Sequence, residues 1–166
     1  MRDDPGKSPA TLGSPRRGTG DYALIAGCDE DATELYVGLA QAEGMEAVVA
    51  QETAEASRIV AERGRPRLCI VDLCMSRDGG FAALLRLSST LAPEDRPPVL
   101  ALVAPELVTT ADDLTEALGI NEMLPRSSGE KVVRAAIRRT LARDVSGRYA
   151  IVPGADGAPL GRAARK

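Results

Sequence analysis

The length, composition and charge of the chain are those of one compact globular domain. It has 166 residues, of which 44% are hydrophobic, with one Phe, three Tyr and no Trp, so the predicted core consists mainly of Ala, Leu, Val and Ile. A formal net charge of -3 argues against a main role in nucleic-acid binding, and the absence of His excludes His-ligated metals and His general bases.

The two ends of the chain differ in composition from its centre. Residues 1–20 are rich in Gly, Pro, Ser and Arg and lack the apolar segment of a secretory signal. No apolar run approaches the roughly 18 residues that a bilayer-spanning helix needs. We therefore expect flexible tails over 1–20 and 145–166, a domain over 21–144 and a cytoplasmic location.

Strand-like and helix-like segments alternate through the predicted domain. Strands are expected at 22–27, 46–50, 67–72, 99–104 and 121–124, and helices at 30–43, 53–63, 80–91, 111–119 and 128–143. Segments 67–72 and 99–104 are apolar on both faces, which is typical of strands inside a parallel sheet. Five strands alternating with five helices predict an α/β domain with a doubly wound parallel sheet.

In such sheets, functional sites lie outside the carboxyl ends of the strands. Asp72 ends the most apolar predicted strand, and the loop LCMSRDGG leads from it into the third helix. A carboxylate at this position can be a nucleophile, a metal ligand or a helix cap. The glycine turn at 79–80 favours a functional site.

Three segments of the chain resemble the receiver domain of two-component response regulators over about residues 21–144. They are VDLCMSRDGGFAALLRL, PVLALVA and EALGINEMLPRSS. The resemblance implies a flavodoxin-like fold with five parallel strands in the order 2-1-3-4-5 and helices on both faces of the sheet. It also implies that Asp72 stands at the phosphoacceptor position and Gly80 at the turn glycine of the family.

The chain departs from the receiver pattern at the positions that hold Mg²⁺. The family ends its first strand with two adjacent carboxylates, and Gly27 and Cys28 stand at these positions here. Asp29 lies one residue beyond and, with Asp72, is the remaining candidate for a magnesium ligand. No other cofactor is expected, and the sequence leaves Mg²⁺ binding open.

Further departures concern the residues that respond to phosphorylation. Val103 stands at the position of the switch Thr or Ser, and Met123 replaces the aromatic residue that moves on activation. Arg126 takes the position of the conserved lysine, with Pro125 before it instead of a proline after it. Val103 cannot donate a hydrogen bond to a phosphoryl oxygen, and a planar guanidinium is no geometric copy of a lysine ammonium. Phosphorylation is therefore expected to produce little conformational response.

Several of these residues also have a purely structural interpretation. Asp72 can pair with Arg126 or cap the third helix, and residues 29–31 can serve as acidic groups at a helix N-terminus. Cys28 and Cys74 can be inert buried thiols or a redox or soft-metal site. The arginines of the last helix can form a solvated face, a protein contact or a nucleic-acid patch; they are Arg134, Arg138, Arg139 and Arg143.

Three functional hypotheses follow. The first is an atypical single-domain bacterial receiver that binds proteins independently of phosphorylation, with no enzymatic activity beyond residual autophosphorylation and autodephosphorylation at Asp72. Its partner would be a histidine kinase or a regulatory protein on the surface of residues 111–143, or a second copy of the chain. The second is a phosphoryl-accepting receiver that uses Asp72, Asp29 and Arg126. The third is a flavodoxin-like nucleotide or flavin binder, which the acidic AGCDEDA segment disfavours.

Overall fold

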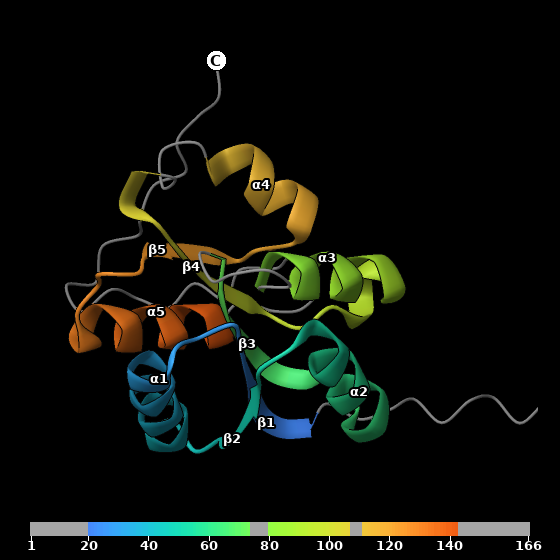
Figure 1. Cartoon of the computed structure of the whole chain (residues 1–166), viewed down its shortest axis with the longest axis horizontal. Helices are drawn as coiled ribbons and strands as arrows, with labels where there is room; N and C mark the ends of the chain where they lie inside the picture. Colours follow the sequence, from blue (N-terminus) through green and yellow to red (C-terminus); the bar gives the residue numbers. More distant parts are fainter. Residues whose placement is uncertain (1–19, 74–79, 107–110, 143–166) are drawn as a thin grey trace, which may run out of the picture.

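The computed structural model describes residues 20–73, 80–106 and 111–142. Within these residues, five strands alternate with five α-helices and one short 3-10 helix (Figure 1). In chain order the elements are β1 (Gly20–Ala26), α1 (Glu30–Ala42), β2 (Glu46–Ala50), α2 (Thr53–Arg63), β3 (Pro66–Asp72), α3 (Gly80–Thr90), η1 (Pro93–Asp95), β4 (Val99–Val103), α4 (Ala111–Leu118), β5 (Glu122–Pro125) and α5 (Glu130–Ala142).

All five strands are parallel, in the order β2-β1-β3-β4-β5. This confirms the predicted doubly wound, flavodoxin-like sheet. β3 is the central strand of the sheet. It pairs with β1, where Ile25 lies beside Ile70, and with β4, where the pairing continues to Asp72 beside Leu102. The carboxyl ends of β1, β3, β4 and β5 consequently meet at one edge of the sheet.

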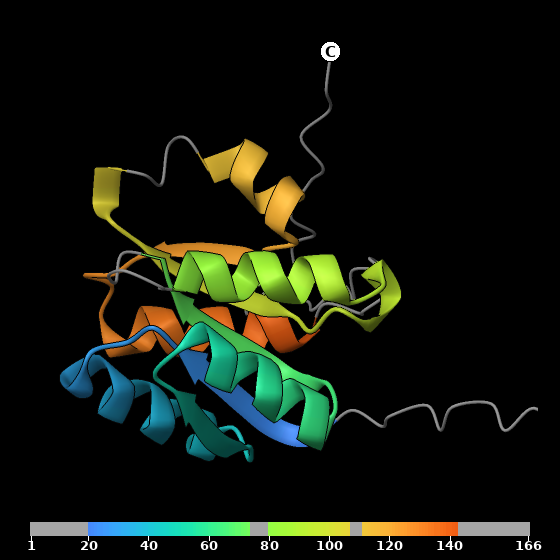
Figure 2. The ribbon, with the colours of Figure 1, turned by 45° about the vertical axis from the view of Figure 1, so that its right-hand side comes forward.

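The helices cover both faces of the sheet (Figure 2). On one face, side chains such as Leu68, Ile70 and Leu100 form a core with α1 and α5. On the other face, Cys69 and Val71 pack with α2, α3 and α4. Neighbouring residues of one strand thus enter opposite core clusters, which explains why 68–71 and 99–104 are apolar at every position.

The structure differs from the predicted boundaries at a few positions. Gly20, expected in the N-terminal tail, belongs to β1, because its N–H donates to the carbonyl of Arg65 at 2.8 Å. The helix η1 was not predicted, and α5 begins at Glu130, two residues later than expected. The rest of both tails, with Cys74 and Arg143, lies outside the described residues. Among the helices of the described ranges, none combines the length and apolar character needed to cross a membrane.

Candidate functional site

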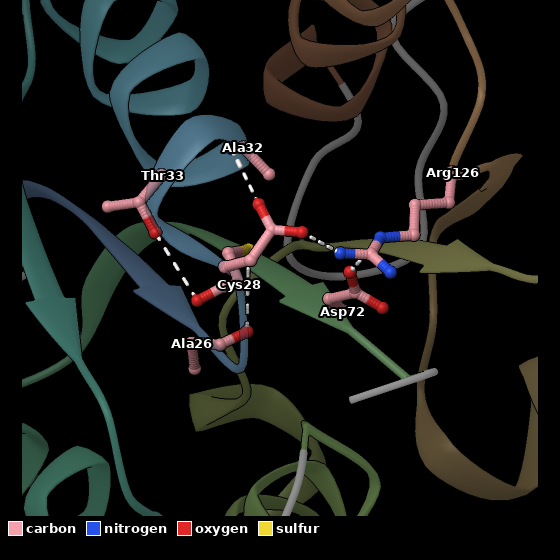
Figure 3. A network of polar contacts seen from close by, with 7 residues as sticks. Ala26, Cys28, Ala32, Thr33, Asp72 and Arg126 are labelled. Carbon is pink, nitrogen blue, oxygen red and sulfur yellow. Dashed lines mark hydrogen bonds and ion pairs between the residues drawn. The ribbon is translucent and has the colours of Figure 1, made fainter. Parts of the chain in front are cut away.

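Three segments far apart in the sequence bring charged side chains together at the carboxyl edge of the sheet (Figure 3). Asp72 is the last residue of β3 and is fully buried. Arg126 follows β5 directly, and its Nε lies 2.9 Å from Oδ2 of Asp72. The Nη2 of Arg126 donates to Oδ2 of Asp29, which follows β1. One guanidinium therefore serves two carboxylates.

Asp29 has a second role at the start of α1. It is the N-cap residue, and its Oδ1 accepts the backbone N–H of Ala32 at 2.8 Å. Beside it, the hydroxyl of Thr33 donates to the carbonyl of Cys28 at 3.4 Å. The acidic helix N-terminus expected for residues 29–31 is therefore present; in addition, Asp29 caps the helix and is bound to Arg126. These contacts tie the beginning of α1 to the end of β5.

The backbone of β4 positions Arg126. The N–H of Arg126 donates to the carbonyl of Val103 at 2.7 Å, and the Val103 side chain is buried. Val103 thus contributes a backbone acceptor and no side-chain hydroxyl. Met123 is partly buried and packs against the core cluster of α2 and α3. The structure brings Asp72, Asp29 and Arg126 together, whereas Val103 and Met123 contribute packing.

Glycines at the edge of the site allow a close approach of the backbone. Gly27 has φ of 75°, and a Cβ atom there would lie 2.9 Å from the carbonyl oxygen of Asp72 and 3.0 Å from the nitrogen of Gly80. A Cβ on Gly80 would overlap the same Asp72 carbonyl and the side chain of Val71. The first position of the family's acidic pair therefore lacks a side chain, and the surroundings leave no room for one.

Cys28, at the second position of that pair, is a buried thiol. Burial and, to a smaller extent, the negative charges of Asp72 and Asp29 raise its pKa to about 12, and Arg126 partly offsets them. Its sulfur makes a weak contact with the carbonyl of Ala26, at 3.8 Å. The raised pKa disfavours the thiolate, which is the form that acts as a nucleophile or binds a metal. Cys28 and Cys69 are both free, and Cys74 lies outside the described residues.

Sequence reasoning missed Tyr36, which lies beside this network. It is buried on α1, and its pKa is raised to about 12 by burial and by the nearby Cys28 and Asp72, while Arg126 opposes the rise. The signal was present in the spacing: Tyr36 comes seven residues after Asp29, two turns along one helix face.

The residues present do not match a magnesium site. Mg²⁺ prefers six oxygen ligands in octahedral geometry. Gly27 offers no side chain, Cys28 offers a protonated sulfur, and Asp72 and Asp29 are both bound to the Arg126 guanidinium. Among the described residues, no group of three or more acidic or thiol side chains could hold a metal ion.

The arginines of α5 are engaged in ion pairs within the protein. Arg134 and Arg138 both donate through Nε to Oε1 of Glu43, at 3.1 and 2.9 Å. Arg139 pairs with Glu122 of β5. Because two carboxylates are bound to these three side chains, the face they form has less free positive charge than a basic nucleic-acid patch.

Comparisons with known proteins find likeness in structure alone. No protein-family model matches the chain, and no curated protein matches it. The receiver domain of NtrX from Brucella abortus matches with 24% identity and a TM-score of 0.60, over 73% of this chain and 98% of that chain. The signal receiver domain of a putative Luxo repressor protein from Vibrio parahaemolyticus matches with 18% identity and a TM-score of 0.61, over 75% of this chain and 92% of that chain.

A third structure extends the comparison to an activated state. The BeF3-activated N-terminal receiver domain of Klebsiella pneumoniae RstA is 17% identical, with a TM-score of 0.58, over 72% of this chain and 97% of that chain. The matched region corresponds in extent to nearly the whole of these receiver domains. The chain therefore has the fold of response-regulator receiver domains.

Proposed function

We propose that this chain is an atypical receiver domain of two-component signalling that acts mainly by binding a protein partner, independently of phosphorylation. The receiver fold supplies the signalling context, which is an analogy at the level of the fold. The observation that carries the proposal is the position of Arg126, whose guanidinium binds both Asp72 and Asp29. A cation that belongs to the protein thus binds the carboxylate at the phosphoacceptor position.

This ion pair opposes phosphoryl transfer to Asp72. A phosphoryl donor needs a free carboxylate oxygen and cations that clamp the equatorial oxygens of the transferred group. Here the carboxylate is fully buried, and the guanidinium is already engaged by two carboxylates. Phosphorylation would have to break the Arg126–Asp72 pair and leave a buried carboxylate partly uncompensated during the approach.

The chain also lacks groups that would convert phosphorylation into a change of shape. A ligand shifts a conformational equilibrium only if it contacts the two states differently. Val103 brings no hydroxyl toward the site, and Met123 has no aromatic ring to move. We therefore assign the domain no enzymatic activity beyond residual turnover at Asp72, and a cytoplasmic role as an interaction module.

The surface over α4, β5 and α5, residues 111–143, is the proposed docking face for a histidine kinase or regulatory protein. On α5, Val132 is 48% exposed, and the neighbouring arginines are held by Glu43 and Glu122. A face with fixed charges around an exposed apolar side chain loses little side-chain entropy when it binds.

A second candidate function is supported by the convergence of Asp72, Asp29 and Arg126. These are two carboxylates and one cation at the carboxyl edge of a parallel sheet, where a receiver accepts a phosphoryl group. Under this alternative, Arg126 would release Asp72 and bind the oxygens of the phosphoryl group. Asp72→Asn would then abolish both labelling by acetyl phosphate and any change in partner affinity.

One titration separates the two candidates. Backbone amide shifts of the full chain are followed by NMR as Mg²⁺ and then beryllofluoride, a mimic of aspartyl phosphate, are added. We expect no saturable shifts around Asp72, α4 or β5 at millimolar Mg²⁺. Saturable shifts that spread from Asp72 to β5, and disappear in Asp72→Asn, would establish the phosphoacceptor and end the first proposal.

A further inference from the structure

Two large apolar side chains of α3 lie on the surface of the molecule. Phe81 is 45% exposed and Leu85 is 50% exposed, although most of the large apolar side chains are buried. Phe81 is the only phenylalanine of the chain. The two residues are four positions apart, so they lie one turn apart on the same side of the helix and form an apolar ridge.

A hollow adjoins this ridge, between α3 and the N-terminal end of α2. It has a volume of about 270 Å³ and is lined by Glu52, Thr53, Ala54, Ala82 and Arg86. Ala82 and Arg86 each follow a ridge residue directly, so they lie about 100° around the helix from it. α2 and α3 lie side by side in both views (Figures 1 and 2).

Opposite charges line this hollow without neutralising each other. Glu52 and Arg86 are both exposed, and neither forms an ion pair with any residue of the described ranges. Most other arginines of the described chain are paired with a carboxylate, for example Arg63 with Glu46 and Arg139 with Glu122. Considering the described residues, the hollow therefore presents one positive and one negative group, neither in an ion pair, beside an apolar ridge.

We propose that the ridge of α3 and the hollow beside α2 form the surface on which a second copy of this chain docks. In a two-fold symmetric contact, each patch meets its own copy, so a ridge and a hollow on one face can fill each other. Phe81 and Leu85 of one copy enter the hollow of the other, over its alanines. Arg86 of each copy then approaches Glu52 of the other, which gives two identical ion pairs at the rim.

This self-complementarity is the reason to choose a second copy over another partner. In a two-fold contact an identical face supplies the complement of each feature: a hollow for the ridge and a carboxylate for the guanidinium. The surface carries both shapes and both signs. The proposed contact lies on α2 and α3, separate from residues 111–143 and from the Asp72 site. The dimer proposal can therefore be tested independently of the proposed function.

Self-association of the full chain is the first measurement. Sedimentation velocity from about 5 to about 500 µM should show a reversible monomer–dimer equilibrium, as expected for a modest apolar contact. Leu85→Glu should raise the dissociation constant by at least about tenfold, because it places a charge in the apolar contact. Val132→Glu, at the comparably exposed site on α5, is the matched control and should leave the constant unchanged.

A charge exchange tests the orientation of the two copies. Arg86→Glu and Glu52→Arg should each weaken association by about threefold to tenfold, because each creates two like-charge contacts at the rim. The double variant should return close to the wild-type constant.

A chain that stays monomeric throughout the range, or a dimer that Leu85→Glu does not weaken, overturns the proposal. So does a double variant as weak as the single ones, or a dimer lost in Val132→Glu, which would place the contact on α5.

Discussion

At the scale of single residues, the chemistry of the site is determined by Arg126, whose N–H groups are shared between two carboxylates. Its Nε faces Asp72, which has no solvent exposure, and its Nη2 faces the partly exposed Asp29. A buried carboxylate is costly unless a charged partner remains close to it. Arginine suits this task because its rigid fork can bind two carboxylates at once, which the point charge of a lysine does less well.

Removing the guanidinium should therefore destabilise the protein more than removing both charges. Arg126→Met is expected to lower the free energy of unfolding by about 2–4 kcal/mol at pH 7, because Asp72 is left charged and buried. Adding Asp72→Asn should recover most of that loss, since no uncompensated charge remains. Urea denaturation of the two single variants and the double variant measures the coupling. Additive effects would show that the pair contributes nothing to stability.

A second prediction at this scale concerns Gly27, where the receiver family has an acidic residue. Gly27→Asp should not create a metal ligand but should lower stability by about 1–3 kcal/mol, because Gly27 has φ of 75° and its Cβ would lie 2.9 Å from the Asp72 carbonyl. Gly38→Ala is the control, since Gly38 lies in α1 with no atom within 4 Å of a Cβ placed there. That variant should gain up to about 1 kcal/mol. Equal effects of the two would refute the steric argument.

At the scale of the elements, α1 is fixed at both ends to the C-terminal part of the domain. Its N-cap Asp29 binds Arg126, and its C-cap Glu43 binds Arg134 and Arg138 of α5. The Glu43 side chain is only 14% exposed, so its two ion pairs are partly shielded from solvent. The two helices also share one core cluster on the same face of the sheet. We infer that α1 and α5 move as one unit.

The Glu43 contacts predict a pH-dependent contribution to stability. Burial alone would raise the pKa of Glu43, but the hydrogen bonds and charges of Arg134 and Arg138 outweigh it and lower the pKa below its ordinary value of 4.5. A lowered folded-state pKa means that the stabilisation is present above the unfolded pKa and is lost as the pH falls through the folded one.

Glu43→Gln should therefore cost about 1 kcal/mol at pH 7, a modest value because both arginines are partly exposed. The difference from the wild type should shrink below pH 4.5, measured as urea midpoints across the pH range. Glu34→Gln, at an exposed position of the same helix, is the control for the loss of one acidic side chain from α1. A loss that is constant with pH would contradict the assignment.

At the scale of the whole molecule, hydrophobic periodicity predicted the five strands and five α-helices, and the resemblance to receiver domains supplied the order of the strands. Buried parallel strands such as β3 and β4 are apolar on both faces. Amphipathic helices such as α5 have an apolar stripe that can be recognised in a single sequence. The convergence of Asp72 and Arg126 was also foreseeable, because parallel strands end at one edge. The steric closure at Gly27 and Gly80 was not, since it depends on three segments in contact.

The last prediction concerns how the stability of the whole chain responds to Mg²⁺. An ion that binds only the folded state raises the free energy of unfolding by RT ln(1 + c/Kd), where c is the ion concentration, which is about 1.8 kcal/mol when the ion is at 20 times its dissociation constant. Because Asp72 and Asp29 are bound to Arg126, the wild type should unfold at the same urea concentration in EDTA and in millimolar Mg²⁺.

The variant Arg126→Ala reverses this expectation. It removes the guanidinium that binds two carboxylates, Asp72 and Asp29, at one edge of the sheet. Its urea midpoint should rise with Mg²⁺, and the further change Asp72→Asn should remove the rise. A wild-type midpoint that rises with Mg²⁺ would mean that the ion displaces Arg126 and that the receiver site is functional. A response confined to Arg126→Ala means that the guanidinium takes the place of the metal.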